Sequence, residues 1–264
     1  MVKFRPIKKS FQINGLYSAF GFQWDESFVF SGESHDFWEA VFVYSGEVEV
    51  TEDENVYILG EGDLIFHAPM EFHRIKSAQG SCPKGFIFTF SALGEFPKRL
   101  SEGIFSLDPA ARKEYEDICQ LVQSFSSDPE NASTGQELAA SLEAFLLRLG
   151  HRSVSPVRSM SGSAMEYRRI VSFMSERVME NLTLSDVARE NNVSVSYIQL
   201  LFSNYAGVSP KAYFNKLRLR RAAELLGEGF SVTEVADQMS FSSPNYFSAF
   251  YKKHTGYSPS EQQR

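Results

Sequence analysis

The sequence lacks the features that mark membrane and secreted proteins. It contains no apolar run of about 18 residues, so no membrane-spanning helix is expected. The first ten residues are basic but lead into no apolar segment, which argues against a secretory signal. Its two cysteines, Cys82 and Cys119, lie 37 residues apart without the spacing of metal ligands. We therefore predict a reduced, cytoplasmic protein with no membrane contact.

Motifs for catalysis are also missing. No serine lies in a Gly-x-Ser-x-Gly turn, and no glycine-rich phosphate-binding loop is present. Nothing in the sequence indicates a nucleophile with its activating base. We therefore predict no catalytic residues, no cofactor and no enzymatic activity.

The net charge of −7 would be unusual for a nucleic-acid-binding protein, but the charge is unevenly distributed. From Ala164 onward, 12 Lys and Arg stand against 10 Asp and Glu, which is +2; the remainder has 14 against 23, which is −9. Attraction to phosphate therefore has to come from local basic clusters. The candidates are Lys216, Arg218, Arg220, Arg221, Lys252 and Lys253. By themselves, these clusters would also fit ordinary solvated helix faces.

One sequence unit occurs twice, from Thr183 to Pro210 and from Ser231 to Pro259, at an offset of 48 residues that becomes 49 after the turn. Each copy has a capping box, a small alanine, a short polar turn, and an amphipathic second helix that ends at a glycine. Helix, tight turn and helix is the pattern of a helix-turn-helix unit. The tandem repeat therefore indicates two such units.

Matching positions define the two copies in detail. The capping boxes pair Thr183 with Asp186 and Ser231 with Glu234. The second helices are expected to start at polar caps and to end at left-handed glycines. These positions are Ser194 and Gly207 in the first copy, and Ser242 or Ser243 and Gly256 in the second. The predicted buried faces are Ile198, Leu201, Phe202 and Tyr205, and Tyr246, Phe247, Phe250 and Tyr251.

A third kind of helix is predicted between the units, over residues 210–226 and closed by Gly227. At 1.5 Å per residue it would span about 25 Å. A rigid rod of this order could hold the two second helices near one DNA turn apart, about 34 Å.

Together, the two units and the helix between them resemble the AraC/XylS-type transcription regulators over about 80 residues. Matching residues occur in both units and in the connecting helix. They include Ala188, Tyr197, Phe202, Gly207, Pro210, Leu217, Ala222, Ala236, Phe241, Phe247, Gly256 and Pro259. The resemblance implies a DNA-binding domain of seven helices.

Residues 28–90 favour many short strands and tight turns, such as the alternating segment from Glu47 to Val50. This pattern is typical of a small antiparallel barrel or a double-sheet jelly roll. The segments HDFWE (35–39) and GDLIFHAPMEFH (62–73) resemble the cupin-like sensory domain of the same regulators. Residues 1–20 are expected to form a partly extended basic arm.

The spacing of apolar residues over 109–150 predicts a pair of helices, each with an apolar stripe. The stripes are Tyr115, Ile118, Leu121, Val122 and Phe125, and Leu138, Leu142, Phe145, Leu146 and Leu149. Part of each stripe is expected to pack on the sheets. The resemblance implies that this pair is also a dimerisation surface, and the surplus apolar positions favour the same interpretation.

We therefore predict a multidomain α+β chain with four parts. Residues 1–108 form a cupin-like ligand-sensing domain with an N-terminal arm, and residues 109–150 form the helical pair. A Ser- and Gly-rich linker covers 151–163, and an all-α double helix-turn-helix domain covers 164–264.

Four residues of the first domain are predicted to bind a small-molecule effector: His35, Phe37, Glu39 and His73. On a strand, the first three would share a face, and His73 could approach from a neighbouring strand. Two histidines with one or two carboxylates could also hold a transition metal, although Glu33 stands where metal-binding cupins have a histidine. The family's sensory domains generally work without a catalytic metal, so we predict an effector site and no metal.

DNA contacts are predicted on the second helix of each unit. The base-facing residues are Val195, Ser196, Gln199, Leu200 and Ser203, and Pro244, Asn245, Ser248 and Ala249. The phosphate contacts are Arg218, Lys252 and Lys253.

The side-chain types at these positions predict the bases. Gln199 and Asn245 can each pair with adenine, while Leu200 and Ala249 can meet a thymine methyl group. Family members often carry arginine at the positions of Leu200 and Ala249, so an operator rich in A·T pairs is expected here, with help from DNA shape. The alternative is that Gln199 and Asn245 only contact phosphate or cap their helices.

These observations predict a sequence-specific DNA-binding transcription regulator under small-molecule control. Its expected partners are double-stranded DNA, an effector, a second copy of the chain and, if it is an activator, RNA polymerase. Two alternatives stay open: a metal-dependent cupin enzyme with a helical appendage, and a regulator whose sensory domain binds a partner protein.

Overall fold

The computed structural model describes residues 5–78, 80–152 and 162–262. The chain divides into two compact units, Met1–Met160 and Ser161–Arg264. The predicted linker at 151–163 falls mainly on residues 153–161, outside the described residues. Within those residues, no helix combines the length and apolar character that crossing a bilayer requires.

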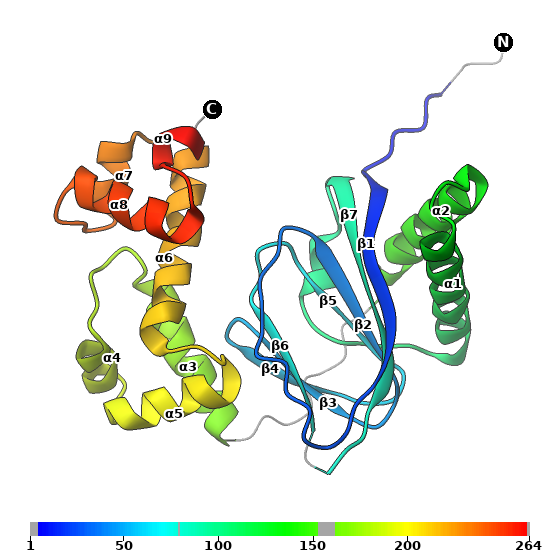
Figure 1. The fold of residues 1–264 in the computed structure, drawn as a ribbon, viewed down its shortest axis with the longest axis horizontal. Coiled ribbons are helices and arrows are strands. Elements are labelled where there is room, and N and C mark those ends of the chain that lie inside the picture. The colour runs from blue at the N-terminus through cyan, green and yellow to red at the C-terminus, as the bar shows by residue number, and fades with distance from the viewer. Residues whose placement is uncertain (1–4, 79, 153–161, 263–264) are drawn as a thin grey trace. The chain divides into compact units, whose positions relative to one another are not determined.

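The first unit contains two antiparallel sheets (Figure 1). One has the strand order β1-β7-β2-β5-β8, and the other has the order β4-β3-β6. The strands are β1 (Phe11–Gln23), β2 (Trp38–Ser45), β3 (Val48–Glu52), β4 (Asn55–Leu59), β5 (Asp63–His67), β6 (His73–Ser77), β7 (Lys84–Gly94) and β8 (Phe105–Ser106). A short 3₁₀ helix spans Lys98–Ser101. Of the two predicted forms, the structure adopts the double-sheet one rather than a closed barrel.

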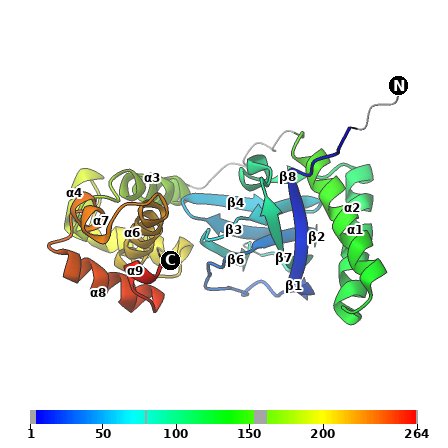
Figure 2. The same cartoon turned by 90° about the horizontal axis from the view of Figure 1, so that it is seen from above.

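The five-stranded sheet is buried on both faces. Phe42, Phe66 and Phe88 point to one face and pack with helices α1 (Pro109–Ser127) and α2 (Ala132–Leu149). Val41 and Ile65 alternate with them and pack toward the three-stranded sheet. Figure 2 shows the two helices of this pair lying beside β1. The period-two pattern therefore produces three layers: helices, large sheet and small sheet.

The structure differs from the partly extended arm that was expected for residues 1–20. Residues from Phe11 to Gln23 form a strand of 13 residues that pairs with β7 over its whole length. Most of its side chains are half-buried or exposed, so its sequence lacks the clear alternation that marks a strand with one buried face. Backbone pairing, rather than side-chain burial, holds this segment.

The apolar stripes of the helix pair are used within the chain. Leu142 and Leu146 are fully buried, with relative exposures of 0%, in the core shared with the sheet. Most of both stripes is therefore buried within one chain, and Leu121 and Phe125 are the members that stay partly exposed. A second copy of the chain that paired through this helix pair would therefore contact the outer faces of α1 and α2.

The second unit is all-helical and contains seven helices in its described residues, as the resemblance implied. They are α3 (Gly162–Glu176), α4 (Leu184–Glu190), α5 (Val195–Tyr205), α6 (Pro210–Gly227), α7 (Val232–Gln238), α8 (Pro244–Thr255) and α9 (Pro259–Gln262). The helix α6 links the two repeated units (Figure 1). This helix ends at Gly227, the residue expected to close it, and the left-handed glycine that follows is Gly229, with φ of 96°.

Candidate functional sites

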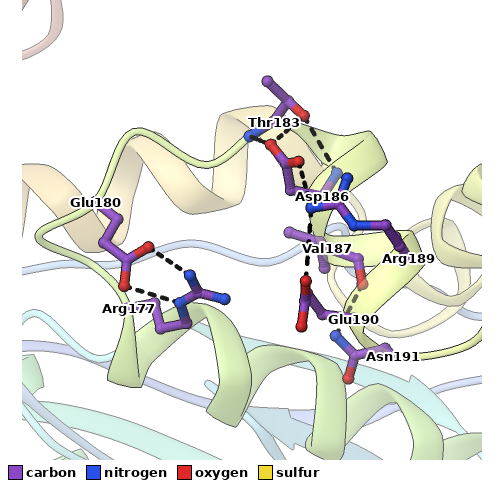
Figure 3. Close-up of polar contacts among 8 residues, drawn as sticks. All are labelled: Arg177, Glu180, Thr183, Asp186, Val187, Arg189, Glu190 and Asn191. Carbon is purple, nitrogen blue, oxygen red and sulfur yellow. Dashed lines mark hydrogen bonds and ion pairs between the residues drawn. The ribbon is translucent and has the colours of Figure 1, made fainter.

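Both predicted capping boxes are present. At the start of α4, the Asp186 N–H donates to Thr183 Oγ1 at 3.2 Å, and the Thr183 N–H donates to Asp186 Oδ2 at 3.1 Å (Figure 3). The corresponding distances for Ser231 and Glu234 at α7 are 3.3 and 2.8 Å. The Thr183 hydroxyl, and to a smaller extent its backbone N–H, donates to Asp186 and lowers the pKa of that carboxyl group. The Ser231 hydroxyl and N–H lower the pKa of Glu234 in the same order. Each box fixes the start of the first helix of its unit.

The end of α4 is fixed by side chains as well. Asn191 is buried, and its amide donates to the Val187 carbonyl at 2.9 Å (Figure 3). Arg169 of α3 donates to the Asn191 side chain at 3.1 Å and to its carbonyl at 2.9 Å. These bonds tie α3 to the turn that precedes α5.

The two turns have the same backbone geometry. Asn192 has φ of 56° and Ser240 has φ of 55°, and these residues are 48 positions apart, which is the offset of the repeat. A left-handed residue reverses the chain after the first helix and costs a non-glycine residue strain energy. The structural repeat therefore includes the strained position itself.

Matching backbone hydrogen bonds close the two turns, and in each unit the acceptor is the carbonyl of the predicted alanine. The N–H of Val193 donates to the Ala188 carbonyl at 3.0 Å, and the N–H of Phe241 donates to the Ala236 carbonyl at 2.9 Å. Both alanines are buried, with relative exposures of 5% and 0%. Buried positions of this kind leave little room for a larger side chain.

The second helices, α5 and α8, start at matching serine caps. Ser194 Oγ accepts from the Tyr197 N–H at 3.0 Å, and Ser243 Oγ accepts from the Tyr246 N–H at 3.1 Å. Of the two serines that the sequence left open, Ser243 is therefore the cap. Left-handed glycines follow both helices, with φ of 65° at Gly207 and 88° at Gly256.

The predicted base-facing residues lie on the accessible sides of these helices. Those that are exposed are Ser196, Gln199, Leu200, Ser203, Asn245 and Ala249. Those that are half-buried are Val195, Pro244 and Ser248. In α8 the predicted core is partly wrong: Phe247 and Tyr251 are buried, Phe250 is half-buried, and Tyr246 is 59% exposed.

Arg218 does not have the accessible position that a phosphate contact needs. Its side chain is 5% exposed, and its guanidinium donates to the carbonyls of Met239 and, at 3.3 Å, Glu180. The guanidinium carbon also lies 4.2 Å from the centre of the Phe241 ring. Burial lowers the pKa of Arg218. This residue therefore joins α6 from inside to the end of α7 and to the loop between α3 and α4, a buried position that differs from the accessible one expected for a phosphate contact.

Lys252 and Lys253 are exposed, as phosphate contacts require. They lie with His254 in the last turn of α8, where positive charge is favourable next to the helix C-terminus. Arg221, another member of the basic clusters, is instead bonded to Glu224 at 2.9 Å. Arg221 is therefore partly balanced by a neighbouring carboxylate, whereas Lys252 and Lys253 lie in a basic last turn.

In the first unit, the structure brings the four predicted effector residues together. The rings of His35 and Phe37 stack with centroids 3.9 Å apart, and His35 meets His73 edge-on at 4.8 Å. The Nε2 atom of His73 lies 3.4 Å from Glu39 Oε1. His35 precedes β2 in a loop, so the strand alternation assumed for residues 35–39 does not apply to it.

Two buried partners were missed from the sequence. His67 stacks on His73 with centroids 4.3 Å apart, and its Nδ1 lies 2.7 Å from Glu52 Oε1. Alternation on β5 predicts the direction of the His67 side chain, because it shares a face with Ile65, which packs between the sheets. That signal was available in the sequence.

Burial favours the neutral forms of the carboxyl and imidazole groups in this cluster. It raises the pKa of Glu39 to about 8, with a further increase from Glu33, and raises the pKa of Glu52 well above its usual range. It also lowers the pKa of His67 to about 3 and that of His73 to about 2. The charged forms of these groups have lost their water, and this loss of solvation is the largest cause of each shift.

A cavity of about 380 Å³ adjoins the cluster. This volume is in the range of small-molecule sites. The lining is mainly aromatic and aliphatic: Phe20, Trp24, Phe28, Phe30, Phe37, Ile75 and Ile87, with Ser18, Glu33, Glu39 and Thr89 as its polar members. Of the four residues predicted to bind an effector, Phe37 and Glu39 line this cavity, whereas His35 and His73 contact those two residues from outside the lining.

Two helix-turn-helix units on a shared helix, together with a double-sheet domain that has a mainly apolar pocket, define a two-domain transcription regulator. Comparison with known families agrees: residues 17–150 match the AraC-like ligand binding domain, and residues 187–264 match a helix-turn-helix domain. The chain belongs to the AraC family of DNA-binding transcription regulators.

Curated relatives extend over most of the chain. The virulence regulon transcriptional activator VirF of Yersinia enterocolitica is 26% identical over 240 residues, covering 82% of this chain and 85% of that protein. The HTH-type transcriptional activator RhaS of Pectobacterium carotovorum is 25% identical over 242 residues, covering 85% and 84%. Among solved structures, unsaturated fatty acid bound ToxT of Vibrio cholerae aligns over 98% of this chain and 97% of its own, at 16% identity and a TM-score of 0.38.

Proposed function

We propose that this protein regulates transcription by placing α5 and α8 in the major groove at two neighbouring sites of one operator. The observation that carries the proposal is the repeated geometry of the two units, which includes the left-handed turns at Asn192 and Ser240. Two structurally equivalent helices present polar and small side chains outward, including Gln199 and Asn245. This is the arrangement through which helix-turn-helix proteins contact base edges.

The helix between the units supports binding across one DNA turn. The 18 residues of α6 span about 27 Å at 1.5 Å per residue. Arg218 fastens α6 to the Met239 carbonyl at the end of α7, so the second unit is held to the rod by more than its covalent link. Successive major grooves on one face of DNA are about 34 Å apart.

The cavity of the first unit is the proposed effector site, with Phe37 and Glu39 in its lining. Control of DNA binding by that ligand is part of the proposal. We also propose a homodimer, formed through the outer faces of α1 and α2, where Leu147 is 45% exposed. RNA polymerase would be a further partner of an activator, and the protein would act in the cytoplasm.

Selection of binding sites from a random DNA pool by the full-length protein tests the proposal. We expect enriched sequences with two conserved patches about one helical turn apart and a preference for A·T pairs in both. Enrichment of a single patch would contradict simultaneous binding by α5 and α8. Absence of any enrichment, with the protein folded, would contradict sequence-specific recognition.

The metal-dependent enzyme and the sensor of a partner protein are the competing proposals. Thermal unfolding of the full chain against a metabolite library separates the second from a small-molecule sensor, because a ligand that binds only the native state raises the melting temperature. We expect a metabolite that raises this temperature and that changes DNA affinity when it is added to the binding assay.

A further inference from the structure

Backbone pairing, and not chance proximity of surface groups, places the acidic and histidine side chains next to the cavity. Glu33 and His73 form a β-bridge, with reciprocal N–H to carbonyl hydrogen bonds of 3.0 Å in each direction. Glu39 lies opposite His67 in the pairing of β2 with β5, and Glu52 lies opposite His73 in the pairing of β3 with β6. Strands of both sheets therefore hold the group in place.

The hydrogen bonds of the histidines determine which nitrogen is free. The Phe37 carbonyl, 2.9 Å from His35 Nδ1, can only accept, so this nitrogen carries the proton. The Glu71 carbonyl, 3.4 Å from His73 Nδ1, favours the same tautomer. The lone pair of each ring is therefore on Nε2. Both Nε2 atoms are buried and have no hydrogen-bond partner among the described residues.

Those lone pairs and the neighbouring carboxylates meet at one point. Ligand atoms from Glu33, His35, Glu39 and His73 all lie within 4.8 Å of one another. His73 Nε2 is 3.4 Å from Glu39 Oε1 and 3.9 Å from Glu33 Oε1. Two ligands at about 2.1 Å from a shared ion are about 3–4 Å apart, so small side-chain shifts suffice.

From this arrangement we propose that Glu33, His35, Glu39 and His73 bind one divalent first-row transition metal ion beside the cavity. Two imidazoles with two carboxylates suit manganese, iron or zinc, whereas magnesium prefers oxygen ligands and water. Histidine ligands usually donate their second N–H to a carbonyl or carboxylate, as His35 and His73 do here. Glu33 and Glu39 also line the cavity, so a cavity ligand with a donor atom could complete the coordination of the ion.

This site goes beyond the proposed regulation of transcription, and its test involves no DNA. Full-length protein is treated with a chelator, dialysed and titrated calorimetrically with Mn²⁺, Zn²⁺ and Mg²⁺ separately. We expect one Mn²⁺ or Zn²⁺ per chain and no comparable binding of Mg²⁺. Binding of neither transition metal would overturn the proposal.

Two variants locate the ion, and a third serves as the control. His73→Asn removes a buried ligand, and Glu33→Gln removes a ligand whose side chain is 53% exposed, so the second change leaves the fold intact. Each should weaken binding by at least about tenfold, whereas His151→Asn, at an exposed histidine of the same unit, should not. If His73→Asn fails to fold, Glu33→Gln alone decides. Wild-type affinity in Glu33→Gln would assign the ion to another place and overturn the site.

Discussion

Arg218 provides the sharpest test of how α6 is held to the end of α7 and to the loop before α4. Replacing it with methionine keeps much of the apolar stem but removes the guanidinium, and with it the bonds to the Met239 and Glu180 carbonyls and the contact with Phe241. One charged hydrogen bond contributes about 1.5–3 kcal/mol. A cation–π contact contributes about 0.5–2 kcal/mol. We therefore expect Arg218→Met to lower the free energy of unfolding of the second unit by about 2–5 kcal/mol.

The chain has its own internal control for this measurement. Both tryptophans, Trp24 and Trp38, lie in the first unit, so their fluorescence reports only on that unit during urea unfolding. Far-UV circular dichroism reports on the helices of both units, so the part of its transition that does not coincide with the tryptophan transition reports on the second unit. Arg218→Met should shift the helical transition down by more than about 1 M urea, for an m-value of about 1–2 kcal/mol/M. The tryptophan transition should stay in place.

Arg221→Met is the matched variant on the same helix. Arg221 forms only surface pairs with Glu224 and Glu228, so its loss should cost less than about 1 kcal/mol. Equal midpoints for the Arg218 and Arg221 variants would refute the internal bridge. If Arg218→Met then lowered DNA affinity without changing stability, the original assignment of Arg218 to phosphate would be restored.

Three further changes test other parts of the structure. Asn192→Val puts a β-branched residue at φ of 56° and should destabilise the second unit by more than about 1 kcal/mol in the same urea assay; an unchanged midpoint would argue against the left-handed turn. Leu142→Ala should cost about 2–5 kcal/mol in the tryptophan-detected transition, because the side chain is fully buried; a shift of oligomeric state without loss of stability would instead place Leu142 at an interface. Lys252→Ala should weaken binding to all DNA nearly equally and reduce the salt dependence by about one counterion in an anisotropy titration, whereas a loss confined to one sequence would indicate base contact.

Local signals in the sequence predicted the second unit well. Capping boxes, serine caps and terminal glycines depend on residues three or four positions apart, so the repeat exposes them directly. The position of Arg218 could not be predicted in this way. Its partners, Glu180 and Met239, are 38 and 21 residues away, and helical periodicity does not distinguish a buried arginine from one at the edge of a solvated face.

The first unit was predicted less completely, for a different physical reason. Strand β1 is held by pairing with β7, and its many accessible side chains give no clear alternation. His35, Phe37, Glu39 and His73 were found from their spacing, but Glu52 reaches His67 only through the packing of one sheet on the other. Contacts between sheets depend on register and layer order, which no short segment specifies.

Direct base recognition by α5 and α8 is the central claim, and paired affinities test it most directly. Gln199→Ala and Asn245→Ala are each measured by fluorescence anisotropy on the selected operator and on random DNA, at one fixed salt concentration. Each variant should lose about 1–3 kcal/mol of binding free energy on the operator and little on random DNA. The reason is that an amide paired with adenine N6 and N7 contributes to binding only at the correct base. Equal losses on both DNAs would reduce these residues to phosphate contacts, and an operator whose essential contacted bases are guanines would contradict the assignment.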